Sequence, residues 1–210
     1  MKQFLLILSL SVLALTGAAQ PMSHYFTQLP AELIPGITID TRKDLIDFSK
    51  NGKLSVMPSA FGGKIQLLTL EDDYLLLKTS ENSDLQIKLL NVSDSLRVLA
   101  VVRTVGAPLR DSRVKFYSST WKPLNDFAMP VFAVKDFIDV KKAVELGLTD
   151  RLNEIGPRLF VSVTFKPNEI TFVAKSSLKA DMEKAQSVSL GALVRDSVVY
   201  RWNKSSFQSE

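Results

Sequence analysis

The sequence of 210 residues contains no cysteine and only one histidine. The absence of cysteine excludes disulfide bonds, iron–sulfur clusters, zinc–thiolate sites and a cysteine nucleophile. A single histidine excludes a metal site built from several histidines of one chain. Glycine and proline are also sparse, at nine residues each, so the chain is neither collagen-like nor a flexible linker. Its stability must therefore come from packing and polar contacts, without covalent cross-links.

A strong excess of charge is missing as well. The chain has 26 Lys and Arg residues against 22 Asp and Glu residues, which gives a formal net charge of +4. This small excess, without a clustered basic stripe, predicts no nucleic-acid partner. Hydrophobic residues make up 46% of the chain, which excludes a disordered protein and is enough for one domain with its own core.

The N-terminus has the pattern of a secretory signal peptide, which we assign to residues 1–19. Lys2 precedes an apolar run over residues 4–15, and small residues after it predict cleavage between Ala19 and Gln20. The run is shorter than the roughly 20 residues that a membrane-spanning helix needs, and we expect no transmembrane segment after signal removal. The expected location is therefore the periplasm, the cell surface or the secreted fraction.

The remainder of the chain reads as one domain. Residues 20–39 contain three prolines and predict an irregular N-terminal segment. Residues 40–210 are expected to form a single α+β domain, which could divide into halves 40–124 and 130–207. No glycine-rich phosphate-binding loop is present in the sequence, so a nucleotide cofactor is not predicted.

Short apolar or alternating runs separated by polar turns predict a largely antiparallel sheet. The runs are residues 64–70, 74–79, 85–90, 96–105, 113–118, 159–166, 170–174 and 198–202. Polar and apolar residues alternate at 86–89 and 114–117, which predicts one solvated face and one packed face.

Helical spacing predicts two or three helices packed on one face of this sheet. One begins at Asp40 or Thr41 as its N-cap, one spans residues 134–144, and a modest third spans residues 178–186. Residues 43–50 resemble residues 135–142, and both segments precede a strand, a turn and a strand. This echo leaves two interpretations open, a duplicated helix-plus-hairpin unit or chance similarity between two amphipathic helices.

Two clusters of side chains are candidates for binding. The consecutive carboxylates of Glu71, Asp72 and Asp73 could hold a hard cation such as Ca²⁺, although the spacing of a calcium-binding loop is absent. Arg110, Arg113 and Trp121 combine the residue types that are favoured at protein-binding hot spots. The alternative is a hydrated turn for the first cluster and an ordinary strand with core aromatics for the second.

Catalytic patterns are weak. No Gly-x-Ser-x-Gly elbow is present in the sequence, and no catalytic residue is assigned. Two serine–lysine pairs, Ser59 with Lys64 and Ser176 with Lys179, are close enough in sequence to leave a serine–lysine hydrolase open. A hydrolase that uses carboxylates is also left open, because its two acids can come from any part of a chain.

Five segments together resemble one protein family: residues 43–48, 62–64, 70–74, 111–117 and 121–124. They are similar to the domain of unknown function 3256 family, which consists of uncharacterised exported proteins of Bacteroidales. The resemblance covers the signal peptide and nearly the whole mature chain. It implies a Gram-negative envelope protein and no activity, so it transfers no catalytic residue. Related sequences often have cysteine near residues 106–108, where this chain has none.

The taxonomic implication of this resemblance adds one modification. Asp94-Ser95-Leu96 and Asp196-Ser197-Val198 resemble the Asp-Ser/Thr-aliphatic motif of O-glycosylation in exported proteins of that phylum. We therefore name Ser95 and Ser197 as expected glycosylation sites. Taken together, the sequence favours a non-catalytic binding or interaction module whose partner is an envelope protein or a glycan. The alternative is an envelope hydrolase that uses carboxylates or a serine–lysine pair.

Overall fold

The computed structural model describes residues 20–182 and 190–210. The predicted signal peptide, with Ala19, lies outside the described residues, and so do positions 183–186 of the third predicted helix. The α-helices are α1 (Met22–Gln28), α2 (Ile39–Lys50), α3 (Val140–Glu145) and α4 (Leu178–Asp181). The 3-10 helices are η1 (Ala31–Leu33), η2 (Val134–Phe137), η3 (Thr149–Glu154) and η4 (Gly191–Leu193).

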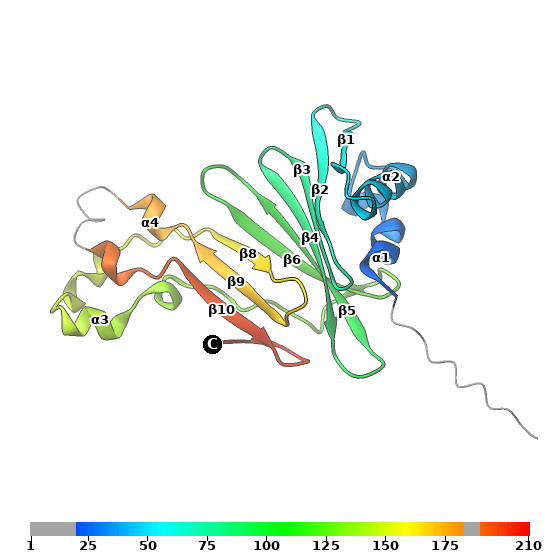
Figure 1. The fold of residues 1–210 in the computed structure, drawn as a ribbon. Coiled ribbons are helices and arrows are strands. Elements are labelled where there is room, and N and C mark those ends of the chain that lie inside the picture. The colour runs from blue at the N-terminus through cyan, green and yellow to red at the C-terminus, as the bar shows by residue number, and fades with distance from the viewer. Residues whose placement is uncertain (1–19, 183–189) are drawn as a thin grey trace, which may run out of the picture.

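The strands form two antiparallel sheets (Figure 1). The seven-stranded sheet is a meander in chain order: β1 (Val56–Pro58), β2 (Lys64–Leu70), β3 (Tyr74–Ser80), β4 (Ser83–Asn91), β5 (Arg97–Val105), β6 (Asp111–Ser118) and β7 (Pro123–Leu124). The four-stranded sheet has the order β11-β10-β9-β8, from β8 (Val161–Phe165), β9 (Thr171–Ser176), β10 (Ser197–Trp202) and β11 (Phe207–Ser209). The short polar turns of the sequence therefore predicted the hairpins correctly.

The seven-stranded sheet is covered on both faces. Helices α1 and α2 pack on one face, which we call the helix face, and the second sheet lies against the other, which we call the inner face (Figure 1). Consecutive residues of β5 show the two cores. Leu99 and Val101 belong to the cluster with the helices, while Ala100 and Val102 belong to the cluster with the second sheet. A strand buried on both faces reads as a continuous apolar run, and β5 does so.

The predicted fold was partly right. The α+β class and the antiparallel pairing are confirmed. The prediction that the helices share one face was wrong, because α2 packs in the core of the helix face while Phe137, Ala143 and Leu178 of the other predicted helices pack in the core with the second sheet. The single sheet was wrong, because there are two sheets. The predicted solvated face was also wrong at residues 86–89, since Gln86 and Lys88 are buried under the second sheet. Their polar groups form hydrogen bonds with backbone groups of residues 163–166. The alternation of residue types within one strand does not indicate such contacts. No helix in the described part of the chain is long and apolar enough to cross a membrane.

The irregular segment predicted at residues 20–39 was also wrong. It forms α1 and η1, and Met22, Tyr25 and Phe26 of α1 are buried in the core of the helix face. Pro21 immediately precedes this helix as its N-cap residue, and proline is tolerated at helix beginnings because the N–H groups there have no intrahelical partner. The prolines therefore separate short helices here.

Helix α2 begins slightly earlier than predicted. Its N-cap is Thr38, whose hydroxyl accepts a hydrogen bond from the backbone N–H of Thr41 at 3.1 Å. Threonine is a favoured N-cap because its oxygen satisfies one of the free N–H groups of the first turn. The helix ends as expected before Asn51 and Gly52, where Gly52 takes a positive φ of 64°.

The helix predicted at residues 134–144 is broken in two. After η2, Ile138 is extended and bridges Val194, and Asp139 caps α3 by accepting from the N–H of Lys142 at 3.1 Å. Aspartate favours a helix N-cap over a helix interior, which explains the break. Residues 135–142 therefore differ in local structure from residues 43–50, which lie within one continuous helix, and the duplication receives no support.

Candidate functional site

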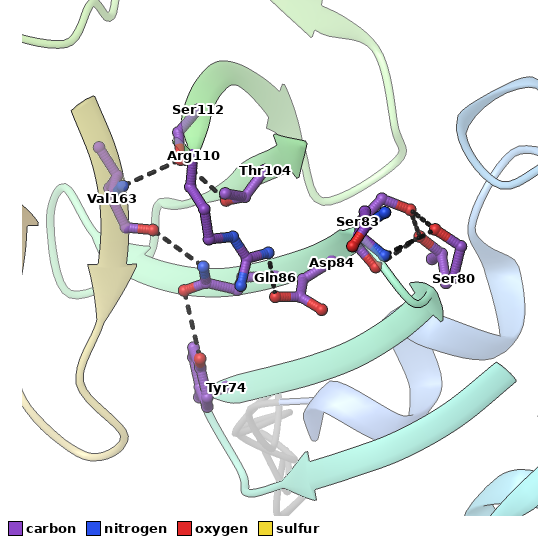
Figure 2. Close-up of polar contacts among 11 residues, drawn as sticks. Tyr74, Ser80, Ser83, Asp84, Gln86, Thr104, Arg110, Ser112 and Val163 are labelled. Atoms are coloured by element: carbon purple, nitrogen blue, oxygen red, sulfur yellow. Dashed lines mark hydrogen bonds and ion pairs between the residues drawn. The ribbon is translucent and has the colours of Figure 1, made fainter. Parts of the chain in front are cut away.

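Buried polar side chains on the inner face of the seven-stranded sheet hold the edge of β8. Gln86 is the centre of this contact, which we call the seam (Figure 2). Its amide nitrogen donates to the carbonyl oxygen of Val163 at 2.9 Å, and its oxygen accepts from the N–H of Phe165 at 3.1 Å. The hydroxyl of Tyr74 donates to the same oxygen at 3.2 Å. Gln86 thus takes the place of a neighbouring strand for β8.

The seam continues toward β6. The Ser112 hydroxyl accepts from the N–H of Val163 at 2.9 Å and shares a 2.8 Å hydrogen bond with the hydroxyl of Thr104, as Figure 2 shows. The Asp111 carboxylate accepts from the N–H of Val161 at 3.3 Å. An edge strand presents unpaired backbone groups that otherwise attract other strands. Here side chains satisfy the N–H groups of Val161, Val163 and Phe165 and the carbonyl of Val163, which leaves fewer groups for another strand.

One acid of the predicted metal cluster, Asp73, belongs to this seam. The Asp73 carboxylate accepts from the Lys88 ammonium at 2.5 Å and from the N–H of Asn168 at 3.0 Å. Lys88 also donates to the carbonyl oxygen of Lys166 at 2.9 Å, and its burial lowers the pKa of its ammonium, although the Asp73 contact opposes this shift. Asp73 therefore joins the two sheets and faces a cation of the chain itself.

The other two acids of that cluster have no such role. The backbone oxygen of Asp72 accepts from the N–H of Met22 at 3.0 Å, and Glu71 lies in the turn before β3. Among the described residues, no three His, Cys, Asp or Glu side chains converge as metal ligands. A Ca²⁺ site at Glu71, Asp72 and Asp73 remains a prediction, and no contact in the seam favours it.

The three residues predicted as one binding face lie apart. Arg110 points to the inner face, where its guanidinium contacts the Asp84 carboxylate at 2.6 Å (Figure 2). Arg113 is exposed on the helix face, directly opposite Arg103. Trp121 is buried, with its ring centroid 5.8 Å from that of Tyr117. Trp121 is thus a core residue, and the two arginines lie on opposite faces.

The serine–lysine pairs are not assembled either. The Ser59 hydroxyl accepts from the N–H of Phe61 at 3.2 Å, and the Ser176 hydroxyl donates to the backbone oxygen of Arg195 at 3.5 Å. Lys179 pairs with Asp196 at 3.1 Å. In the described chain, neither pair is joined by a hydrogen bond between serine and lysine, and no catalytic geometry results.

The expected modification sites are accessible. Ser95 is exposed in the turn between β4 and β5, and Ser197 is exposed as the first residue of β10. Glycosylation at either residue remains a prediction. Gln20, the expected first residue after cleavage, is exposed as well.

A groove that sequence reasoning missed lies on the helix face, at the ends of β2 to β5. We call it the Phe61 groove, and its volume is about 410 Å³. Ile65 and Leu85 form part of its floor, and residues 33–37 and the β1–β2 turn form its walls. A volume of this size with mostly apolar walls is typical of ligand sites.

Phe61 dominates one wall. Its ring is 78% exposed and lies over Gly36, which has a φ of +78°. A Cβ added at Gly36 would lie 2.7 Å from the Phe61 ring, so its absence lets the ring lie this close, and the positive φ itself favours glycine. Gly62 and Gly63 follow Phe61 with positive φ angles and complete the turn. The glycines therefore allow the turn that carries an exposed aromatic ring.

Polar side chains also line the groove, among them Asp84 and a group of hydroxyls at the β3–β4 turn. The hydroxyls of Thr79, Ser80 and Ser83 form a chain, with 2.6 Å from Thr79 to Ser83 and 2.8 Å from Ser80 to Ser83; Figure 2 shows Ser80 and Ser83. Arg103 lines the same groove and donates to the backbone oxygen of Leu33 at 2.6 Å. Hydroxyls and a guanidinium beside an aromatic ring can orient a ligand that has both an apolar and a polar part.

Comparisons with known proteins identify the family of the chain and a similar fold. The family model described as "Protein of unknown function (DUF3256)" matches residues 14–207. The fold is similar to a domain of an uncharacterized protein from Porphyromonas gingivalis W83, with a TM-score of 0.73 and 24% sequence identity over 91% of this chain and 100% of that one. No curated protein matches. These similarities establish family and fold, and they name no activity.

Proposed function

The chain belongs to the DUF3256 family of proteins of unknown function, and from that premise we propose that it is an exported, non-catalytic binding module. The proposed location is the periplasm or the cell surface, and the proposed partner is an envelope protein or a glycan. The Phe61 groove supports this function most directly. The N-terminal sequence, with its charged residue, short apolar run and small-residue cleavage site, supports export.

The groove supports binding because its most exposed wall residue is a large aromatic. Burying a phenylalanine ring stabilises a complex by roughly 1.5–3 kcal/mol, and the Phe61 ring is left 78% exposed. Aromatic and arginine side chains are the types enriched at binding hot spots. Phe61 and Arg103 provide one of each in the same groove.

A capture experiment with purified variants tests this function. Wild-type protein, Phe61→Ser and Val131→Ser are immobilised and exposed to solubilised envelope proteins and to a panel of envelope glycans. Val131 is the matched control, since it is 94% exposed and does not line the groove. We expect a ligand that wild type and Val131→Ser retain, and whose affinity for Phe61→Ser falls about tenfold or more. Equal retention by all three proteins would exclude the groove as the binding site.

A further inference from the structure

The second half of the seven-stranded sheet ends in an open edge. Strand β6 pairs with β5 along its whole length, but on its other side it pairs with β7 only at Phe116 and Tyr117. Strand β7 ends at Leu124, so Arg113, Val114 and Lys115 have no strand on that side in the described chain. In an antiparallel strand the backbone groups of successive residues point to opposite sides, and Ser118 donates its N–H to Lys122 on the β7 side. Of the three residues, Val114 is therefore the one whose N–H and C=O can receive an added strand in line with β7.

A groove runs beside this open edge. Its volume is about 380 Å³, and its lining includes the apolar side chains of Val114, Leu124, Phe127 and Met129 together with Lys115. These apolar side chains are only partly buried, and they pack against the core between the two sheets. An added strand directs alternate side chains to opposite faces of the sheet. Its apolar residues would enter this groove, and the residues between them would lie on the helix face.

The helix face at this edge carries unpaired positive charge. Arg113 and Lys115 are exposed two residues apart on β6, and Arg103 lies directly opposite Arg113 on β5. In the described chain, the side chains of Arg113 and Lys115 have no hydrogen bond or ion pair, while Arg110 and Arg195 contact carboxylates. Like charges opposite each other on neighbouring strands are destabilising. Carboxylates added on this face would relieve that repulsion.

We propose that the edge of β6 at residues 113–115 binds an extended segment of a partner polypeptide in which acidic and apolar residues alternate. The segment adds a strand beside β6, with its carboxylates at Arg113 and Lys115 and its apolar side chains in the groove lined by Val114, Phe127 and Met129. The backbone groups of β6 provide the affinity, and the two faces select the sequence.

The same charges disfavour a second copy of this chain as the occupant. Pairing of two β6 edges would bring Arg113 and Lys115 of one molecule against the same residues of the other, and this repulsion disfavours self-association. The β6 edge therefore favours an acidic strand over the β6 edge of a second copy. Arg103 also lines the Phe61 groove, but Arg113, Val114 and Lys115 do not, so each proposal can fail without the other.

Peptide binding to the ¹⁵N-labelled protein tests the proposal. The probe is an acetylated and amidated heptapeptide, Val-Asp-Val-Glu-Val-Asp-Val, and the control peptide has the same composition with its acids adjacent. We expect binding below about 1 mM with amide shifts concentrated at Arg113, Val114 and Lys115. The clustered peptide should bind roughly tenfold more weakly, since only alternation satisfies both faces. A third peptide, N-methylated at alternate residues, should lose binding because it cannot pair with β6.

Charge reversal separates this site from general electrostatic attraction. The affinity of the variant Arg113→Glu/Lys115→Glu for the acidic peptide should fall about tenfold or more. This variant should instead bind a peptide in which Val and Lys alternate. The matched control, Lys43→Glu/Lys50→Glu, changes the net charge equally on exposed positions of α2 and should bind as wild type. The proposal would be overturned by amide shifts confined to another part of the protein or by unchanged peptide binding of the β6 variant. Tight binding of the N-methylated peptide, or equal binding of the anionic polysaccharide polygalacturonate, would overturn it as well.

Discussion

Replacing Gln86 with leucine is expected to lower the free energy of unfolding by about 3–5 kcal/mol. The substitution leaves the carbonyl of Val163, the N–H of Phe165 and the hydroxyl of Tyr74 without their partner. Each buried polar group that loses its hydrogen bond costs about 1–3 kcal/mol. Urea denaturation of the purified variant measures the change.

A second leucine substitution serves as the control for Gln86. Gln66 lies on β2, is only partly buried and makes no side-chain hydrogen bond with a described residue. Gln66→Leu should change the unfolding free energy by about 0.5 kcal/mol or less. In Gln86→Leu, the amide of Phe165 should also exchange with solvent faster than in wild type. Equal stability of the two variants would contradict the seam as the contact that joins the sheets.

Replacing Arg42 with methionine is expected to destabilise the protein by about 3 kcal/mol. The Arg42 side chain is buried in α2, and its guanidinium donates to the carbonyl oxygens of Thr27, Leu29 and Ile37 at 3.1, 2.5 and 3.2 Å. Burial lowers the pKa of this guanidinium, and relief of the buried charge offsets part of the loss. The carbonyls would be left without a donor, which accounts for the remainder.

At position 42 we expect the protein to require the guanidinium group of arginine and not only a positive charge. Arg42→Lys should recover only part of the stability, because an ammonium cannot reach three separate carbonyls as a planar guanidinium does. The neighbouring Lys43→Met should change stability by about 0.5 kcal/mol or less, since Lys43 is exposed and its ion pair with Asp40 is 3.6 Å long at the surface. Thermal and urea denaturation of all three variants compare them. Full stability of Arg42→Met would show that α1 does not depend on this contact.

Arg42 also connects stability to the proposed function. It anchors α1 and the backbone at Ile37, and residues 33–37 form a wall of the Phe61 groove. Gly36 of the same wall supports the Phe61 ring. A buried arginine therefore positions the segment that holds the exposed aromatic, and its loss should weaken ligand binding as well as folding.

Local features of the fold could be predicted from the sequence, and long-range ones could not. Turn residues at 71–73 and 91–95 predicted hairpins, because turn chemistry is set by adjacent residues. The docking of the second sheet depends on contacts such as Gln86 to Val163, which are 77 positions apart. A glutamine that alternates with apolar residues reads as solvent-exposed, and nothing nearby in the sequence indicates that it is buried.

The candidate site shows the same division. Arg110 and Arg113 are three positions apart in the sequence. Because side chains alternate along a strand, this odd spacing places them on opposite faces of one sheet. The sequence did contain one signal for the groove, an exposed-type turn in which Phe61 is followed by two glycines. Only the structure places Gly36 beneath the ring.

Photo-crosslinking in the native host tests the central claim, that this protein acts by binding a partner at the Phe61 groove. Benzoylphenylalanine replaces Phe61 in one strain and Val131 in another, so that two exposed sites carry the same reactive group. We expect a discrete adduct at position 61 that weakens when Arg103→Gln is added, and no adduct of that mass at position 131. Absence of an adduct at position 61, or the same adduct at both positions, would contradict the account.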